Sequence, residues 1–108
     1  MFRKIIGEQT IVKKEYNDTQ ILIKGSITFT NGFILDFMEL KNTKNKTKIK
    51  YKYHFMNTEN EMQFRYDNAK HHPEIKTFPH HKHISNIVVK SEKPELFDVL
   101  AEIQDCIL

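Results

Sequence analysis

The sequence has little of what marks secreted, membrane or disordered proteins. Its 108 residues include one cysteine, no tryptophan, three glycines and three prolines. The single thiol, Cys106, cannot form an internal disulfide, and no apolar run approaches the ~20 residues that a membrane-spanning helix needs. The N-terminus lacks the long apolar core of a signal peptide. We therefore expect one soluble domain over residues 1–108, located in the cytoplasm.

Several catalytic signatures are also missing. The chain has no G-x-S-x-G nucleophile turn, no glycine-rich phosphate loop and no H-E-x-x-H helix. These absences argue against an α/β-hydrolase, a P-loop nucleotide hydrolase and a zinc metalloprotease of the common type. Any chemistry has to come from other residues.

What the chain does contain is alternation of apolar and polar residues, which is typical of strands. ILIKGSITF (21–29) and FILDFMEL (33–40) each alternate, and Thr30–Gly32 lies between them. A three-residue loop there places Ile27 opposite Leu35 and Gly25 opposite Phe37, which keeps one face apolar. We predict a hairpin with that register.

A second pair of segments alternates more strictly. In KTKIKYKYHFM (46–56), Ile49 and the aromatic residues share one face, and the lysines with His54 share the other. A four-residue loop over 57–60 would pair this strand with EMQFRYD (61–67), opposing Phe55 with Met62 and Tyr53 with Phe64. One hairpin would then have an aromatic face and a basic face.

The two ends of the chain complete the predicted fold. HISNIVV (83–89) is expected to form a strand, and residues 91–108 a helix that Ser91 caps, with an apolar stripe of Leu96, Val99, Leu100, Ile103 and Ile107. The first residues predict a short helix over 2–7 and a first strand over 10–16. The fold class is α+β: an antiparallel sheet of about five to six strands with the C-terminal helix packed on one face.

Basic residues are concentrated in the middle of the chain. Residues 41–52 carry six lysines and no acid. On the predicted hairpin, Lys48, Lys50, Lys52 and Arg65 would share one sheet face, at the ~6.6 Å spacing of alternate strand residues. Such a stripe suits a phosphate backbone, and it equally suits a solvated face that protects a sheet edge.

Histidines are concentrated directly after this hairpin. Five of the six lie in RYDNAKHHPEIKTFPHHKH (65–83). A histidine near neutral pKa can take the 2′-OH proton of RNA, and arginine or lysine can stabilise the charged phosphorane. His81 and His83 also have the H-x-H spacing of metal ligands on a strand, with a carboxylate at Asp67 or Glu74. Both readings remain open on the residues alone.

The segment from Phe64 to His83 resembles the signature of the TumE family of small prokaryotic proteins. The shared features are a strand ending in R-Y-D-N, a histidine pair before Pro73, and the run T-F-P-H-H-K-H. The ending S-E-x-P-x-L-x-x-V-L, from Ser91, also fits, while Lys70 stands where many relatives have proline. The resemblance implies a single TumE-like domain, a toxin of a toxin–antitoxin pair, and a helix-turn-helix antitoxin as partner.

Together these observations predict a toxin that acts on RNA as a histidine-dependent endoribonuclease. In that prediction His81 and His83 are the general base and acid. The full catalytic set is Arg65, Asp67, His71, His72, His81 and His83, and the nucleic-acid-binding set is Lys48, Lys50, Lys52 and Lys82. No cofactor is assigned. The alternatives are a metal-dependent nuclease or phosphodiesterase and a non-catalytic module that binds nucleic acid or protein; a homodimer is also left open.

Overall fold

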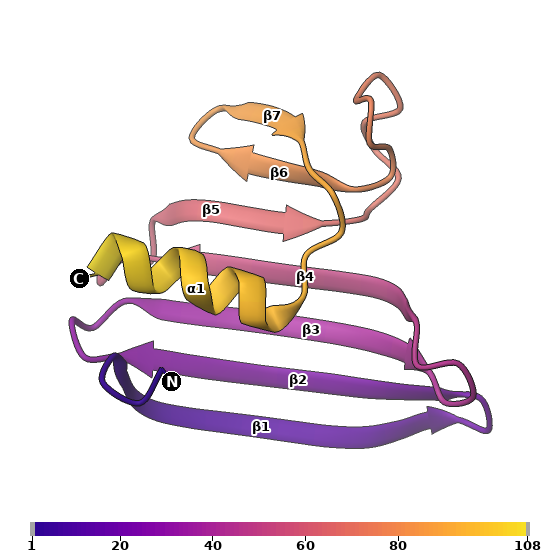
Figure 1. Cartoon of the computed structure of the whole chain (residues 1–108), viewed down its shortest axis with the longest axis horizontal. Helices are drawn as coiled ribbons and strands as arrows, with labels where there is room; N and C mark the ends of the chain where they lie inside the picture. The colour runs from indigo at the N-terminus through magenta and orange to yellow at the C-terminus, as the bar shows by residue number, and fades with distance from the viewer. Residues whose placement is uncertain (1, 108) are drawn as a thin grey trace.

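The protein is a single antiparallel sheet with one helix packed on it (Figure 1). A computed structural model describes residues 2–107. The strands lie side by side in chain order: β1 (Ile6–Asn17), β2 (Gln20–Phe29), β3 (Ile34–Asn42), β4 (Lys48–Met56), β5 (Met62–Asp67), β6 (His81–Ile84) and β7 (Ile87–Lys90). The helix is α1 (Leu96–Ile107). The α+β class is confirmed.

The strand count differs from the prediction, because the sheet has seven strands and not five to six. The segment over 83–89 is not one strand. It turns back at Ser85, whose φ of 51° lies in the left-handed region, and forms the β6–β7 hairpin. The short helix over 2–7 is also wrong: that segment is a turn, and β1 begins at Ile6.

The hydrophobic core lies between the sheet and α1. Val99, Leu100 and Ile103 of α1 are buried with the apolar side chains of β2 to β5, as the predicted stripe requires. The helix begins at Leu96, where the Asp98 carboxylate accepts a hydrogen bond from the Glu95 N–H. The predicted Ser91 cap is therefore wrong, because Ser91 lies five residues earlier and bonds the Thr77 hydroxyl through its N–H.

The predicted β2–β3 register is confirmed, with Ile27 opposite Leu35 and Gly25 opposite Phe37. Gly25 is required there: a Cβ atom would lie 2.5 Å from the Phe37 ring, which is buried. The glycine thus makes room for an aromatic side chain on the core face.

The β4–β5 register is shifted by two residues from the prediction. Tyr53 lies opposite Tyr66 and Phe55 opposite Phe64. The loop is longer than expected, since the Asn57 side chain accepts hydrogen bonds from the N–H groups of Glu59 and Glu61, and an irregularity follows next to Met56. A shift of two leaves every side chain on its predicted face, because strand side chains alternate with a period of two.

A second irregularity changes the face of one lysine. Between Leu40 and Lys41 the pairing with β4 skips one residue, Ile49. Ile49 is consequently 43% exposed, and Lys48 points to the helix side, where it is buried. The prediction that Lys48 shares a face with Lys50 is wrong for this reason.

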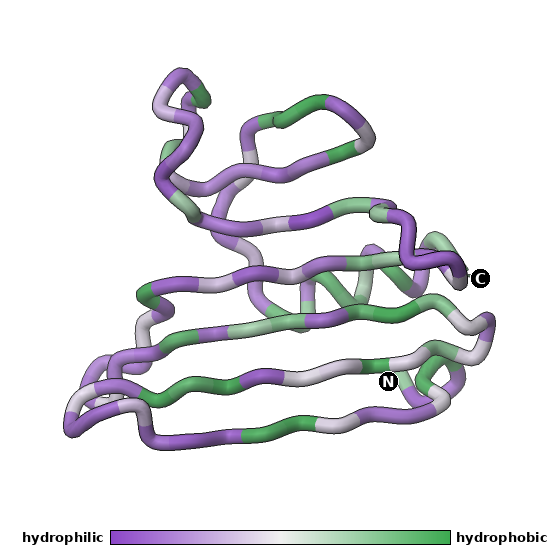
Figure 2. Tube along the Cα trace, turned by 180° about the vertical axis from the view of Figure 1, so that it is seen from behind, coloured by the Kyte–Doolittle hydropathy of each residue, from purple (hydrophilic) through white to green (hydrophobic). Residues whose placement is uncertain are grey.

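The sheet face opposite α1, which we call the open face, carries the side chains of Arg65, Asp67, His81 and His83. Hydrophilic residues dominate β5, the loop that follows it, and β6 (Figure 2). None of the helices within residues 2–107 is long and apolar enough to cross a membrane.

Candidate functional site

Asp67, the last residue of β5, is the centre of the polar cluster on the open face. It is 6% exposed. Its Oδ1 accepts hydrogen bonds from the Ala69 N–H at 3.0 Å and lies 2.8 Å from His81 Nε2, and its Oδ2 accepts from Arg65 Nε at 3.0 Å. The carboxylate is thus oriented by its own strand, the next turn and the neighbouring strand β6.

His81 lies beside Asp67, opposite it in the β5–β6 pairing, and only 2% of it is exposed. Its Nδ1 is 2.9 Å from the Pro79 carbonyl oxygen, and its Nε2 faces Asp67. Both of its ring nitrogens are therefore engaged within the protein. In this arrangement His81 holds Asp67 in place and has no free ring nitrogen for proton transfer to a substrate.

His83 is the more accessible histidine of the pair. It lies opposite Arg65 on the neighbouring strand, and its Nε2 is 3.2 Å from an Arg65 terminal nitrogen and 3.4 Å from Asp67 Oδ2. Burial lowers the pKa of His83 and the Arg65 charge lowers it further, while Asp67 opposes this. His83 is consequently a neutral imidazole at neutral pH, accepting a hydrogen bond from Arg65.

His72 reaches the same point from the loop that joins β5 to β6. Its ring centroid lies 5.0 Å from that of His81 and 5.7 Å from that of His83. Its Nδ1 is 3.3 Å from a Glu74 carboxylate oxygen. His71, which was predicted with the catalytic set, is exposed. It lines the hollow beside Lys70 and also the hollow that contains Arg65 and Asp67, but it is not among the three histidines that meet.

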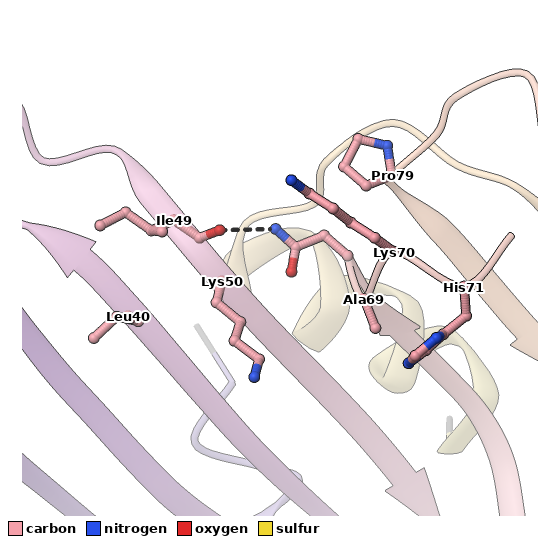
Figure 3. Close-up of a pocket in the computed structure, with 8 residues that line it drawn as sticks. Leu40, Ile49, Lys50, Ala69, Lys70, His71 and Pro79 are labelled. Carbon is pink, nitrogen blue, oxygen red and sulfur yellow. Dashed lines mark hydrogen bonds between the residues drawn. The ribbon is translucent and has the colours of Figure 1, made fainter. Parts of the chain in front are cut away.

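Asn68 fixes where the loop leaves the sheet. Its side chain donates to the Ile49 carbonyl oxygen and accepts from the Tyr51 N–H, both at 3.1 Å. Figure 3 shows the bond to Ile49 at the rim of the hollow formed by β4, the loop and Pro79. The sequence signal was weak: asparagine after a strand end favours a turn, but its partner is 19 residues away.

His80 anchors the far end of this loop. Its Nδ1 lies 2.9 Å from the hydroxyl oxygen of the buried Tyr51, and the two rings are stacked at 5.8 Å. Burial lowers the pKa of His80. The Thr77 hydroxyl also donates to the His80 carbonyl oxygen. His80 therefore holds the loop on the sheet, and it is not among the three histidines that meet at the cluster.

The predicted lysines divide between the two faces. Lys50 and Lys52 are exposed on the open face, and Lys52 lies opposite Asp67. Lys82 lies on the helix side, with its Nζ 2.7 Å from a Glu102 oxygen and 4.8 Å from the centre of the Tyr66 ring. Lys48 is also on the helix side, so neither Lys48 nor Lys82 lies beside the other two.

Lys48 instead belongs to a buried polar network that the sequence did not reveal. Its Nζ donates to the Tyr53 hydroxyl at 2.6 Å and to the Pro94 carbonyl oxygen. The Glu39 carboxylate, 5% exposed, lies 3.9 Å away and accepts from the Tyr53 hydroxyl. Burial lowers the pKa of Lys48, against the opposing effect of Glu95 and Glu39. This network ties α1 to the sheet.

His54, the sixth histidine, lies on the open face opposite Asp36 and Arg65. Burial lowers its pKa, and the charges of Arg65 and Lys52 lower it further. It is outside the group of three histidines. The open face thus combines a neutral imidazole, a fixed carboxylate and three cationic side chains, Lys50, Lys52 and Arg65.

The comparison with protein families defines the class. Residues 2–107 match the family described as toxin TumE, so the chain belongs to the TumE toxin family. The match covers nearly the whole chain, and it confirms the resemblance seen in the segment from Phe64 to His83. Neither curated proteins nor solved structures give a match.

Proposed function

We propose that this protein is the toxin component of a toxin–antitoxin pair and that it cleaves RNA at the cluster around Asp67. The observation that carries the proposal is the placement of Lys50, Lys52 and Arg65 on one face, leading to His83 and His72. Cations beside accessible imidazoles supply both parts of RNA cleavage, phosphate binding and proton transfer.

The reaction is a transesterification within the RNA. His83 takes the 2′-OH proton, the 2′ oxygen bonds the adjacent phosphorus, and the bond from phosphorus to the 5′ oxygen breaks. A protonated His72 gives its proton to the leaving 5′ oxygen, so the products are a 2′,3′-cyclic phosphate and a 5′-OH. Arg65 moves from His83 to the phosphate, which frees the Nε2 lone pair and stabilises the charged phosphorane.

This assignment revises the roles expected from sequence. His81 was predicted as acid or base, but it is 2% exposed with both ring nitrogens engaged. We therefore assign it to positioning Asp67. His72, which was predicted in the catalytic set but not as base or acid, takes the second proton-transfer role because it faces His83 from the loop.

A test compares induced expression of the parent chain with His83→Ala, and cleavage of RNA by the purified proteins. We expect the parent to arrest bacterial growth and His83→Ala to lose cleavage by roughly 100- to 10,000-fold, the usual contribution of a general base. Lys44→Ala is the control, since Lys44 is exposed in the β3–β4 turn, away from the cluster. Full activity of both His83→Ala and His72→Ala would overturn the assignment.

The lysines provide a second prediction. Replacing Lys50 and Lys52 together by alanine should weaken binding of single-stranded RNA and flatten its dependence on salt. For single strands, each phosphate contact contributes about −0.7 to the slope of log K against log salt. Loss of two contacts should therefore make this negative slope shallower by about 1.4. The matched control is Lys44→Ala, an exposed lysine in the β3–β4 turn. An unchanged slope would remove these lysines from the interface.

A metal-dependent nuclease is the second candidate function, and the meeting of three histidines favours it. A non-catalytic binding module differs from both, since substitutions of the lysines would then reduce function and substitutions of the histidines would not.

We further propose a helix-turn-helix antitoxin as the partner and the cytoplasm as the location. A homodimer would use the outer edge of β1, whose Ile11 and Val12 are half exposed or more.

A further inference from the structure

The three histidines of the cluster bring ring nitrogens close together. One nitrogen from each of His72, His81 and His83 lies within 4.8 Å of the other two. The rings meet edge to face, at interplanar angles of 68°, 73° and 74°, and are not stacked. This arrangement brings nitrogen atoms together from a loop and from two alternate positions of β6, as a three-histidine metal site does.

His81 has the surroundings of a metal ligand. Its Nδ1 donates to the Pro79 carbonyl oxygen, which leaves the lone pair of the neutral ring on Nε2. That lone pair faces an oxygen of the Asp67 carboxylate at 2.8 Å. Two lone pairs cannot face each other at this distance without a cation between them. A proton on Nε2 meets the requirement in the metal-free protein. A metal ion can replace this proton once the two atoms move apart, because each metal–ligand bond is about 2.0–2.2 Å long.

The ligands beside His81 favour a metal for two reasons. His72 has a carboxylate of Glu74 3.3 Å from its Nδ1, the second-shell partner that metal-bound histidines commonly have. His83 Nε2 lies 3.2 Å from an Arg65 terminal nitrogen, and it becomes available to a metal once Arg65, whose side chain is 33% exposed, moves away.

We propose that His72, His81, His83 and Asp67 bind one divalent transition-metal ion of the zinc class. Three imidazoles and one carboxylate suit Zn²⁺, which prefers four nitrogen, sulfur or oxygen ligands, and they suit Mg²⁺ and Ca²⁺ poorly. The binding itself is independent of the proposed function. Its consequence rests on that function: zinc occupies the lone pair with which His83 takes a proton, so excess zinc slows RNA cleavage.

The test titrates zinc(II) into the full chain, purified without a histidine tag and stripped with a chelator. We expect one zinc per chain, with at least tenfold weaker binding in His72→Ala and in His83→Ala. Both side chains are partly exposed, so the variants should fold, which circular dichroism checks. His71→Ala is the control and should bind like the parent, and magnesium should not compete.

Cobalt(II) provides a second readout, because a four-coordinate site gives strong visible absorption that the His83→Ala variant should lose. Absence of zinc binding in the parent, or equal binding by all variants, would overturn the site. Zinc binding as expected, in a protein that does not cleave RNA, would leave the site standing and remove the proposed function. The two failures are therefore distinguishable.

Discussion

Replacing Lys48 by methionine should lower the free energy of unfolding by about 3–5 kcal/mol, the cost of breaking a buried ion pair by removing one partner. Only 2% of the Lys48 side chain is exposed. Without its ammonium group, the buried Glu39 carboxylate keeps only the partly exposed Lys41 as a cation within 4 Å, and the Pro94 carbonyl oxygen loses its donor. Urea denaturation of the metal-free protein measures the change.

Lys50→Met is the matched control, because Lys50 is only two residues away and lies exposed on the open face. We expect it to change the unfolding free energy by less than ~0.5 kcal/mol. Adding Glu39→Gln to Lys48→Met should recover part of the loss, since no buried charge then remains unpaired. Equal changes in the unfolding free energy of Lys48→Met and Lys50→Met would contradict the burial of Lys48 that the irregularity at Ile49 produces.

The second large effect is expected from Asp67→Ala, which should destabilise the protein by roughly 2–4 kcal/mol. The carboxylate holds the Ala69 N–H, His81 and Arg65 together, and His81 is buried without access to water. The same substitution should abolish RNA cleavage and weaken zinc binding. Urea denaturation and the cleavage assay measure the two effects on one preparation.

The control for this change is Asp36→Ala, a carboxylate on the open face that is exposed. It should change stability by less than ~0.5 kcal/mol. A double-mutant cycle of Asp67→Ala with His81→Ala should give a coupling energy of about 1–3 kcal/mol, as expected for residues in direct contact. Additive effects would show that the two side chains do not depend on each other.

The sequence by itself determined the elements that depend on local alternation. The β2–β3 register follows from one apolar face and a short loop, and the C-terminal helix follows from its stripe of apolar residues. The sequence also predicted that Arg65, Asp67 and His83 lie close together, because the histidine segment begins where β5 ends and returns as β6. These features need only the period of a strand or a helix.

The tertiary structure decided the features in which the period is interrupted. The irregularity at Ile49 places the Lys48 side chain on the opposite side of the sheet from the predicted one. The alternating sequence from Lys46 to Met56 contains no signal of this irregularity. The contacts of Lys48 with Glu39 and with the Pro94 carbonyl oxygen offset the cost of burying its charge. Glu39 lies on the neighbouring strand and Pro94 lies 46 residues away, so the alternation within one strand carries no information about them.

The histidines illustrate the same division. The sequence placed five of them in one segment, and only the fold separates His80, which anchors the loop on Tyr51, from the three that meet at Asp67. The difference lies in contacts across strands that are distant in sequence. Local periodicity determined which faces exist, and long-range packing decided which side chains meet on them.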